Sequence, residues 1–201
     1  MNKFSMFIAA GFALAASVTA TVTAASAEGL YVSGLFGFSG GGGEYGNTGA
    51  DLVLDMGQVG SLAVGNDFGN IRVEGEIAFR QNNFDHITGV PVDGEMSSLA
   101  LMANAYYEFG DNGWFFRPYL GAGLGAANVT HTSVFFGTDD EDTTFALQLM
   151  LGGSIPFTDY FAMTVDWRLF GAVPSFVTKF GTPFDQGYGI SSVMLGARYT
   201  F

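Results

Sequence analysis

Residues 72–80, RVEGEIAFR, place four charged side chains at alternating positions. Arg72, Glu74, Glu76 and Arg80 occupy even positions, and the odd positions between them hold mainly apolar residues. This period of two is typical of a β-strand with one polar and one apolar face. Arginines and carboxylates on one face can form ion pairs, and breaking such a pair affects stability most where water is excluded. The rest of the chain determines whether this face is turned to water or to an interior.

Two glycine-rich motifs could indicate catalysis or nucleotide binding. Residues 37–41 fit G-x-S-x-G, the hydrolase pattern that places a serine, here Ser39, on a turn between a strand and a helix. A run of glycines follows instead, so we interpret the motif as a flexible strand end entering a loop. Residues 121–126 fit the dinucleotide-binding pattern, with Glu141 about twenty residues further on. No helical pattern follows them, so we interpret these glycines as inward residues of a narrow barrel.

An acidic run and two histidines are the remaining candidates for chemistry. The four consecutive carboxylates of residues 139–142 lack the spacing and turn glycine of a calcium loop, so we expect a solvated loop tip. The alternative is that these carboxylates weakly bind a divalent cation, which bridges them to lipopolysaccharide. His86 and His131 lie in or beside different long loops, where a lone histidine is usually an exposed titratable group. We predict no enzymatic activity, no cofactor, and no catalytic or metal-binding residues.

The first 27 residues have the pattern of a cleavable secretory signal peptide. Lys3 precedes a short apolar stretch, and the small residues Ala25, Ser26 and Ala27 come before Glu28. We expect cleavage after Ala27, which leaves residues 28–201 as one domain. Without Lys3, six cationic side chains face nineteen acidic ones, a net charge of −13 that disfavours nucleic acid as a partner. The chain has no cysteine, which excludes disulfides and thiolate chemistry.

Eight stretches with a period of two follow the signal peptide, and no stretch is long and apolar enough for a transmembrane helix. We predict strands at 30–39, 59–68, 71–84, 97–109, 114–130, 144–157, 160–170 and 190–201. Three connections are tight, at 69–70, 110–113 and 158–159, and aromatic residues flank each of them. The other four are long and acidic, carrying Glu44, Asp51 and Asp55; Asp85, Asp93 and Glu95; residues 139–142; and Asp185. Short turns at one end and long polar loops at the other are typical of an antiparallel up-and-down transmembrane β-barrel.

All five arginines of the mature chain lie on the less apolar face of their strands, with four acids at matching parity. A nearly neutral set of charges suits a closed polar interior in which each charge has a partner. We therefore predict a lumen charge network of Arg72, Glu74, Glu76, Arg80, Glu108, Arg117, Asp166, Arg168 and Arg198. Turns at 69–70 and 110–113 place Arg72 and Glu108 at similar depth, so we expect these two residues to form an ion pair.

With these features the chain resembles the small eight-stranded outer-membrane proteins of Gram-negative bacteria, such as the OmpA-, OmpX- and opacity-type barrels. The resemblance rests on residues 72–76 (RVEGE), 104–107 (NAYY), 118–125 (PYLGAGLG) and 195–201 (LGARYTF). It implies that Tyr199 and Phe201 form part of the signal read by the barrel-assembly machinery during biogenesis. Apolar Met194 replaces the polar residue usual in that signal. The resemblance also implies outer-membrane lipid and lipopolysaccharide as surroundings.

These inferences predict an all-β, eight-stranded barrel in the outer membrane, monomeric and with a lumen filled by side chains. The favoured role is structural or surface-interacting, through loops outside the cell. A narrow porin-like channel for small solutes or ions is the main alternative. A lipid-modifying enzyme and a periplasmic lipocalin-like binder are further alternatives.

Overall fold

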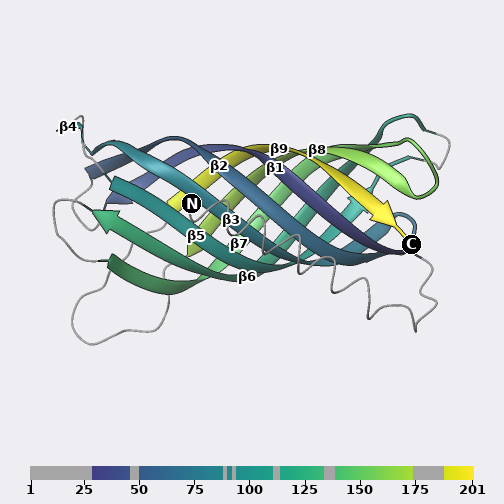
Figure 1. Cartoon of the computed structure of the whole chain (residues 1–201), viewed down its shortest axis with the longest axis horizontal. Coiled ribbons are helices and arrows are strands. Elements are labelled where there is room, and N and C mark those ends of the chain that lie inside the picture. The colour runs from purple at the N-terminus through teal and green to yellow at the C-terminus, as the bar shows by residue number, and fades with distance from the viewer. Residues whose placement is uncertain are drawn as a thin grey trace, which may run out of the picture.

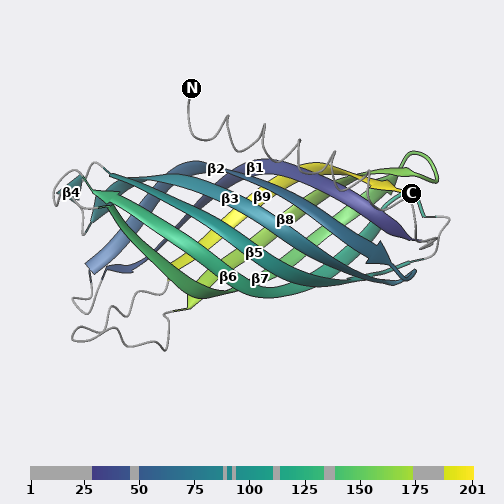
Figure 2. The ribbon, with the colours of Figure 1, turned by 60° about the horizontal axis from the view of Figure 1, so that its bottom comes forward.

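The computed structural model describes residues 29–45, 50–87, 90–91, 94–110, 114–133, 139–173 and 188–201. It contains the strands β1 (Leu30–Tyr45), β2 (Ala50–Asp67), β3 (Ile71–Ile87), β4 (Val90–Pro91), β5 (Gly94–Glu108), β6 (Arg117–Ser133), β7 (Asp139–Pro156), β8 (Phe161–Val173) and β9 (Tyr188–Thr200). Each of the eight long strands pairs antiparallel with its sequence neighbours, and β1 also pairs with β9 (Figure 1). The sheet is therefore closed into a tilted barrel, seen from a second side in Figure 2. The prediction of an eight-stranded antiparallel barrel is confirmed.

The strand boundaries differ from the prediction mainly at the loop end. Strand β2 begins at Ala50 rather than 59, and β1 continues through the glycine run to Tyr45. Acids assigned to loops lie in strands instead, namely Glu44, Asp51, Asp55, Asp85, Glu95 and residues 139–142. At the other end, Trp114 to Phe116 precede β6 rather than opening it. Backbone pairing continues where side chains no longer alternate in polarity, so the period of two underestimates these strands.

The tight turns gather at one end of the barrel, opposite β4 (Figure 1). Gly69 and Gly110 both have positive φ angles, of 92° and 99°, which glycine adopts without steric cost. At the third turn Thr158 Oγ1 accepts hydrogen bonds from the backbone N–H groups of Tyr160 and Phe161. The C-terminus lies at the same end, where the Phe201 N–H donates to the Leu30 carbonyl at 2.9 Å. Residues 111–113 of the second predicted turn lie outside the described part.

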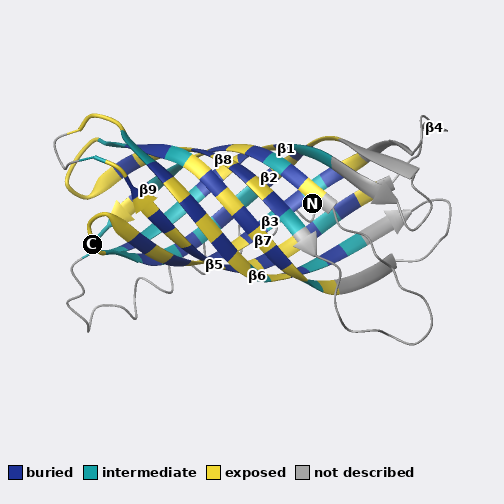
Figure 3. Ribbon diagram, turned by 180° about the vertical axis from the view of Figure 1, so that it is seen from behind, coloured by how far each residue is buried: buried dark blue, intermediate teal, exposed yellow. Residues whose placement is uncertain are grey.

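Over most of the described strands, side chains alternate between the lumen and the outer surface, as the chequered colouring of Figure 3 shows. The outer surface carries the apolar residues: Leu101 is 68% exposed and Leu195 is 60% exposed. The lumen carries the charges, and Arg72 is only 4% exposed. This polarity is the reverse of a soluble protein's, as in barrels that face lipid. No helix among the described residues is long and apolar enough to cross a membrane.

The lumen is filled by side chains, but it is not polar throughout. Toward the loop end it contains a buried apolar layer of Met96, Ala100, Met102, Ala127, Val129, Ala146, Phe170 and Ile190. The period-two pattern predicted a polar interior and did not indicate this layer, because most members of the layer are small or lie at the ends of the predicted strands. The charged residues lie mainly between this layer and the turn end.

Candidate functional site: the lumen charge network

All nine residues predicted to form the lumen network lie on inward-facing positions. Eight of them are buried, and Arg117 is partly exposed, with 18% of its side chain accessible. The inward positions of β3 contribute four of the nine, which is the period noted in RVEGEIAFR. The network divides into two clusters, one centred on Glu108 and one on Glu76.

The turn-side cluster contains Glu108, on which three arginines converge. Arg72 Nε lies 2.8 Å from Glu108 Oε1, and Arg198 Nη1 lies 3.3 Å from the same oxygen. Arg117 Nη1 lies 3.7 Å from Glu108 Oε2. Arg198 Nη1 also lies 3.5 Å from Oδ2 of Asp67, which the sequence analysis omitted. With Asp67 included, five arginines meet five carboxylates, so the charges of the lumen residues that the structure describes sum to zero.

Three tyrosine rings surround the guanidinium of Arg72. Its Cζ lies 4.7 Å from the ring centre of Tyr106, 5.0 Å from that of Tyr119 and 5.8 Å from that of Tyr31. Cation–π contacts of this kind are strongest where the cation is shielded from water. Each ring covers a glycine directly opposite on the next strand. These pairs are Tyr31 with Gly65, Tyr106 with Gly121, and Tyr119 with Gly152.

Glu74 lies among neutral donors. The Tyr106 hydroxyl donates to Glu74 Oε1 at 2.7 Å, and the Tyr31 hydroxyl donates to Oε2 at 2.8 Å. Asn104 Nδ2 donates to Oε1 at 3.1 Å. Two of the three tyrosines that stack on Arg72, Tyr31 and Tyr106, therefore also bind Glu74, which fixes their ring orientation.

The second cluster is centred on Glu76 in the middle of the lumen. Arg168 Nη1 donates to Glu76 Oε2, and Arg168 Nη2 lies 2.9 Å from Asp166 Oδ2. Gln148 Nε2 donates to Glu76 Oε1 at 3.0 Å. Arg80 Nη2 donates to Gln148 Oε1 at 3.4 Å, and its guanidinium lies 3.9 Å from the centre of the Phe170 ring. Arg80 thus joins the charged cluster to the apolar layer.

Several neutral members of this network were not predicted from the sequence. Tyr31, Asn104, Tyr106, Tyr119 and Gln148 have inward parity, which the sequence contains, but nothing local to them indicates a partner. Their partners lie on other strands, up to 72 residues away for Gln148 and Glu76. Only the register of the closed barrel brings them together.

The G-x-S-x-G serine lies inside β1 and has a structural role. Ser39 Oγ donates to Asn82 Oδ1 at 3.1 Å. Asn82 Nδ2 in turn donates to the backbone carbonyls of Ser39 and Asp55, where the β1–β2 and β2–β3 registers shift. The strand does not end at Ser39, so the expected loop entry is wrong. Gly41 approaches β9 closely, since an added Cβ would lie 2.3 Å from the Gly189 carbonyl oxygen.

The other motifs also lie in strands. Residues 121–126 are part of β6, as is His131, whereas His86 belongs to β3. The acidic run opens β7 rather than forming a loop tip. The side chains of these acids and histidines lie outside the described part. In the part that is described, no three His, Cys, Asp or Glu residues form a group that could hold a metal ion.

An inside-out barrel with buried lumen charges corresponds to a known family. The family model for the outer membrane protein beta-barrel domain matches residues 10–201. The chain belongs to this family. It is accordingly a protein of the outer membrane, as the resemblance and the outward apolar surface predicted. No curated protein matches the chain by sequence.

Solved structures of other outer-membrane barrels align with this family member. Neisserial surface protein A aligns with a TM-score of 0.60 and 17% identity, covering 86% of this chain and 97% of that one. AlkL, determined in DMPC bilayers, aligns with a TM-score of 0.48 and 17% identity, covering 89% and 93%. Ail of Yersinia pestis aligns with a TM-score of 0.47 and 16% identity, covering 86% and 99%. At 17% identity, the likeness to Neisserial surface protein A concerns the fold.

Proposed function

We propose that the protein spans the outer membrane as a closed, side-chain-filled barrel with a structural or surface-interaction role. The outward apolar positions of β5 begin at Leu99, and Phe109 continues them one residue past the end of the strand. A strand rises about 3.4 Å per residue and barrel strands tilt by about 40°, so this stretch corresponds to roughly 25 Å along the barrel axis. That height matches the apolar band of outer-membrane barrels.

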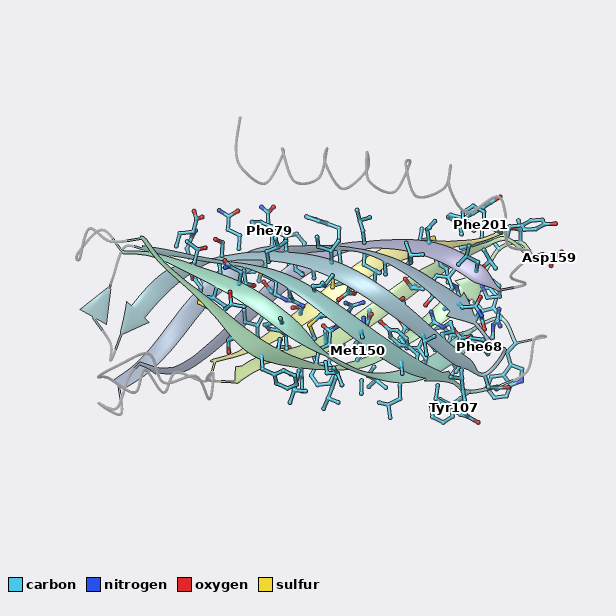
Figure 4. The ribbon with its side chains drawn as sticks, turned by 90° about the horizontal axis from the view of Figure 1, so that it is seen from below. Phe68, Phe79, Tyr107, Met150, Asp159 and Phe201 are labelled. Atoms are coloured by element: carbon cyan, nitrogen blue, oxygen red, sulfur yellow. The ribbon has the colours of Figure 1, made fainter. Side chains whose placement is uncertain are left out.

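Aromatic side chains support the same placement of the membrane. Figure 4 shows Phe68, Tyr107 and Phe201 together at the turn end, where aromatic residues mark a membrane–water interface in such barrels. Toward the other end, Trp167 Nε1 donates to the outward Ser191 Oγ at 2.9 Å. On β3 and β5, the outward side chains of the facing pair Gln81 and Ser97, nearer the loop end, are polar. We infer that the turns face the periplasm and that the loop end faces outside.

The observation that favours this role over a channel is the packing of the lumen. Two ion-pair clusters and a buried apolar layer lie in series along the barrel axis. A cavity between the clusters has a volume of about 10 Å³, room for one water molecule. An eight-stranded barrel is just wide enough for its own interior side chains. Contacts with other molecules would then be made through the loop end.

Further parts of the proposal rest on the sequence. We propose that residues 1–27 are removed after Ala27 and that Tyr199 and Phe201 present the assembly signal. Both side chains point outward, and their rings pack edge to face with ring centres 5.3 Å apart. The partners proposed are the assembly machinery during biogenesis and lipid with lipopolysaccharide afterwards. We propose a monomer without enzymatic activity.

Conductance in planar bilayers tests the closed-lumen role. Refolded residues 28–201 should pass at most a small, intermittent current, because each ion would have to displace buried ion pairs and the apolar layer. An open porin at the same protein concentration is the positive control. Parallel unheated and heated gel lanes verify that the sample is folded, since folded barrels resist detergent until boiled. A large, steady conductance from folded protein would favour the narrow channel instead.

A further inference from the structure

The cavity in the lumen lies between the two charged clusters. Its lining includes Arg72 and Arg198 from the turn-side cluster and Asp166 and Arg168 from the central cluster. Thr164 also lines it, one inward position before Asp166 on β8. Gly196, opposite Thr164 on β9, contributes no side chain to the space. The cavity therefore lies between the two clusters and is lined by residues of both.

Three side-chain oxygens that line this cavity have no hydrogen-bond partner among the described residues. They are Ser33 Oγ, Thr164 Oγ1 and Asp166 Oδ1. Thr164 is 6% exposed and Asp166 only 1% exposed. The other oxygen of Asp166 binds Arg168, so Oδ1 is the one that remains available. Leaving such a group buried without a partner costs about 1 to 3 kcal/mol, and more for a charged group.

Size and charge define the ligand that would satisfy these oxygens. A volume of about 10 Å³ accommodates one water-sized molecule. A bare cation is disfavoured because three arginines line the cavity, and a bare anion is disfavoured by Glu74 and Asp166. Asp166 Oδ1 requires a donor, whereas the two hydroxyls can donate or accept. Water meets all of these requirements.

We propose that this cavity is a binding site for one long-lived water molecule. The water donates to Asp166 Oδ1 and exchanges hydrogen bonds with Thr164 Oγ1 and Ser33 Oγ. It thereby satisfies the three unpartnered oxygens of the cavity that separates the turn-side cluster from the central cluster. It exchanges from the turn end, where Arg117 and Asp67 are each nearly one-fifth exposed, because the apolar layer blocks the loop end.

The test compares Thr164→Val, which removes the hydroxyl at nearly constant volume, with Thr164→Ser, which keeps it. Thr143→Val is the matched control, since Thr143 is exposed on the outer face. Crystal structures at a resolution that shows ordered water should contain the molecule in wild-type protein, Thr164→Ser and Thr143→Val. We expect Thr164→Val to lose it. Water-to-amide cross-relaxation at residues 164–166, measured by NMR in micelles, should show the same pattern.

Gel mobility without heating verifies that each variant is folded before it is compared. A dry cavity in wild-type protein would overturn the proposal. Anomalous density from crystals grown in bromide would overturn it in favour of an anion site. Retention of the water in a folded Ser33→Ala, Thr164→Val double variant would show that these hydroxyls do not bind it.

Discussion

At the scale of single residues, Glu108 has the most ion-pair partners in the turn-side cluster. It is 2% exposed, and its two oxygens face Arg72, Arg198 and Arg117. Removing it leaves these cations close together in a poorly solvated lumen. Breaking a buried pair in this way typically costs about 3 to 5 kcal/mol, and any water entering the lumen lowers this cost. We predict that Glu108→Ala lowers the free energy of unfolding by a value in this range, measured by urea titration in micelles.

A double-mutant cycle separates pairing from general damage. Glu108→Ala combined with Arg72→Ala should recover part of the loss, but only part, because Arg198 and Arg117 have still lost their contacts with Glu108. Glu95→Ala, which removes an exposed carboxylate from the same strand, should change stability by less than about 0.5 kcal/mol. Strictly additive losses for the Glu108 and Arg72 variants would contradict the pairing.

At the scale of elements, three pairs of neighbouring strands each pack a tyrosine of one strand over the glycine opposite it on the next. A Cβ added at Gly121 would lie 2.5 Å from the Tyr106 ring, which must therefore move. Movement disturbs both the hydrogen bond to Glu74 and the contact with Arg72. We predict that Gly121→Ala destabilises the barrel by about 1 to 3 kcal/mol, the usual cost of overpacking, as measured by urea unfolding.

Gly75→Ala provides the matched control for this prediction. Gly75 faces outward on β3, and an added Cβ there would meet nothing within 4 Å. We expect this variant to be neutral or slightly stabilising, because alanine reduces the conformational entropy of the unfolded chain. Equal losses for the two variants would show that backbone flexibility, not the Tyr106 contact, accounts for the effect.

The last strand supports a second prediction at this scale. Phe201 is 49% exposed, and its N–H completes the pairing of β9 with β1. Deleting Phe201 should reduce the folded protein recovered from the outer membrane, because it removes a proposed recognition residue and one closing hydrogen bond. Phe68→Ala, which removes another exposed aromatic at the same end, should have a smaller effect on assembly. If the deletion variant and the wild type insert into the outer membrane to a similar extent, Phe201 is not part of an assembly signal.

At the scale of the whole molecule, the distribution of polarity fits export to the outer membrane. A chain with its apolar side chains outside requires lipid, so it must reach the outer membrane. We predict that the protein purified from outer membranes begins at Glu28, as measured by intact mass. Protein in that membrane with a mass that retains residues 1–27 would contradict cleavage after Ala27. Ala27→Leu should slow processing, because the site requires small residues.

The sequence by itself determined which side of each strand faces inward. The period of two separates Arg72 from Val73 and Leu101 from Met102, because successive side chains of a strand point to opposite faces. The pattern of a glycine with aromatic neighbours likewise predicted the turn at 69–70, where Gly69 has a positive φ angle. These signals are local, so the number of strands, the direction of the charges and the outer-membrane location could be predicted without a structure.

Only the tertiary structure decided which inward residues meet. Arg198 reaches Glu108 across 90 residues of sequence, and Arg168 reaches Glu76 across 92. These contacts depend on the stagger of all eight long strands at closure, which no single strand encodes. The apolar layer and the strand extensions at the loop end were missed for a related reason. The apolar layer is buried by side chains from the opposite wall of the barrel. The strand extensions are held by backbone pairing with neighbouring strands. Neither cause leaves a pattern in the local sequence.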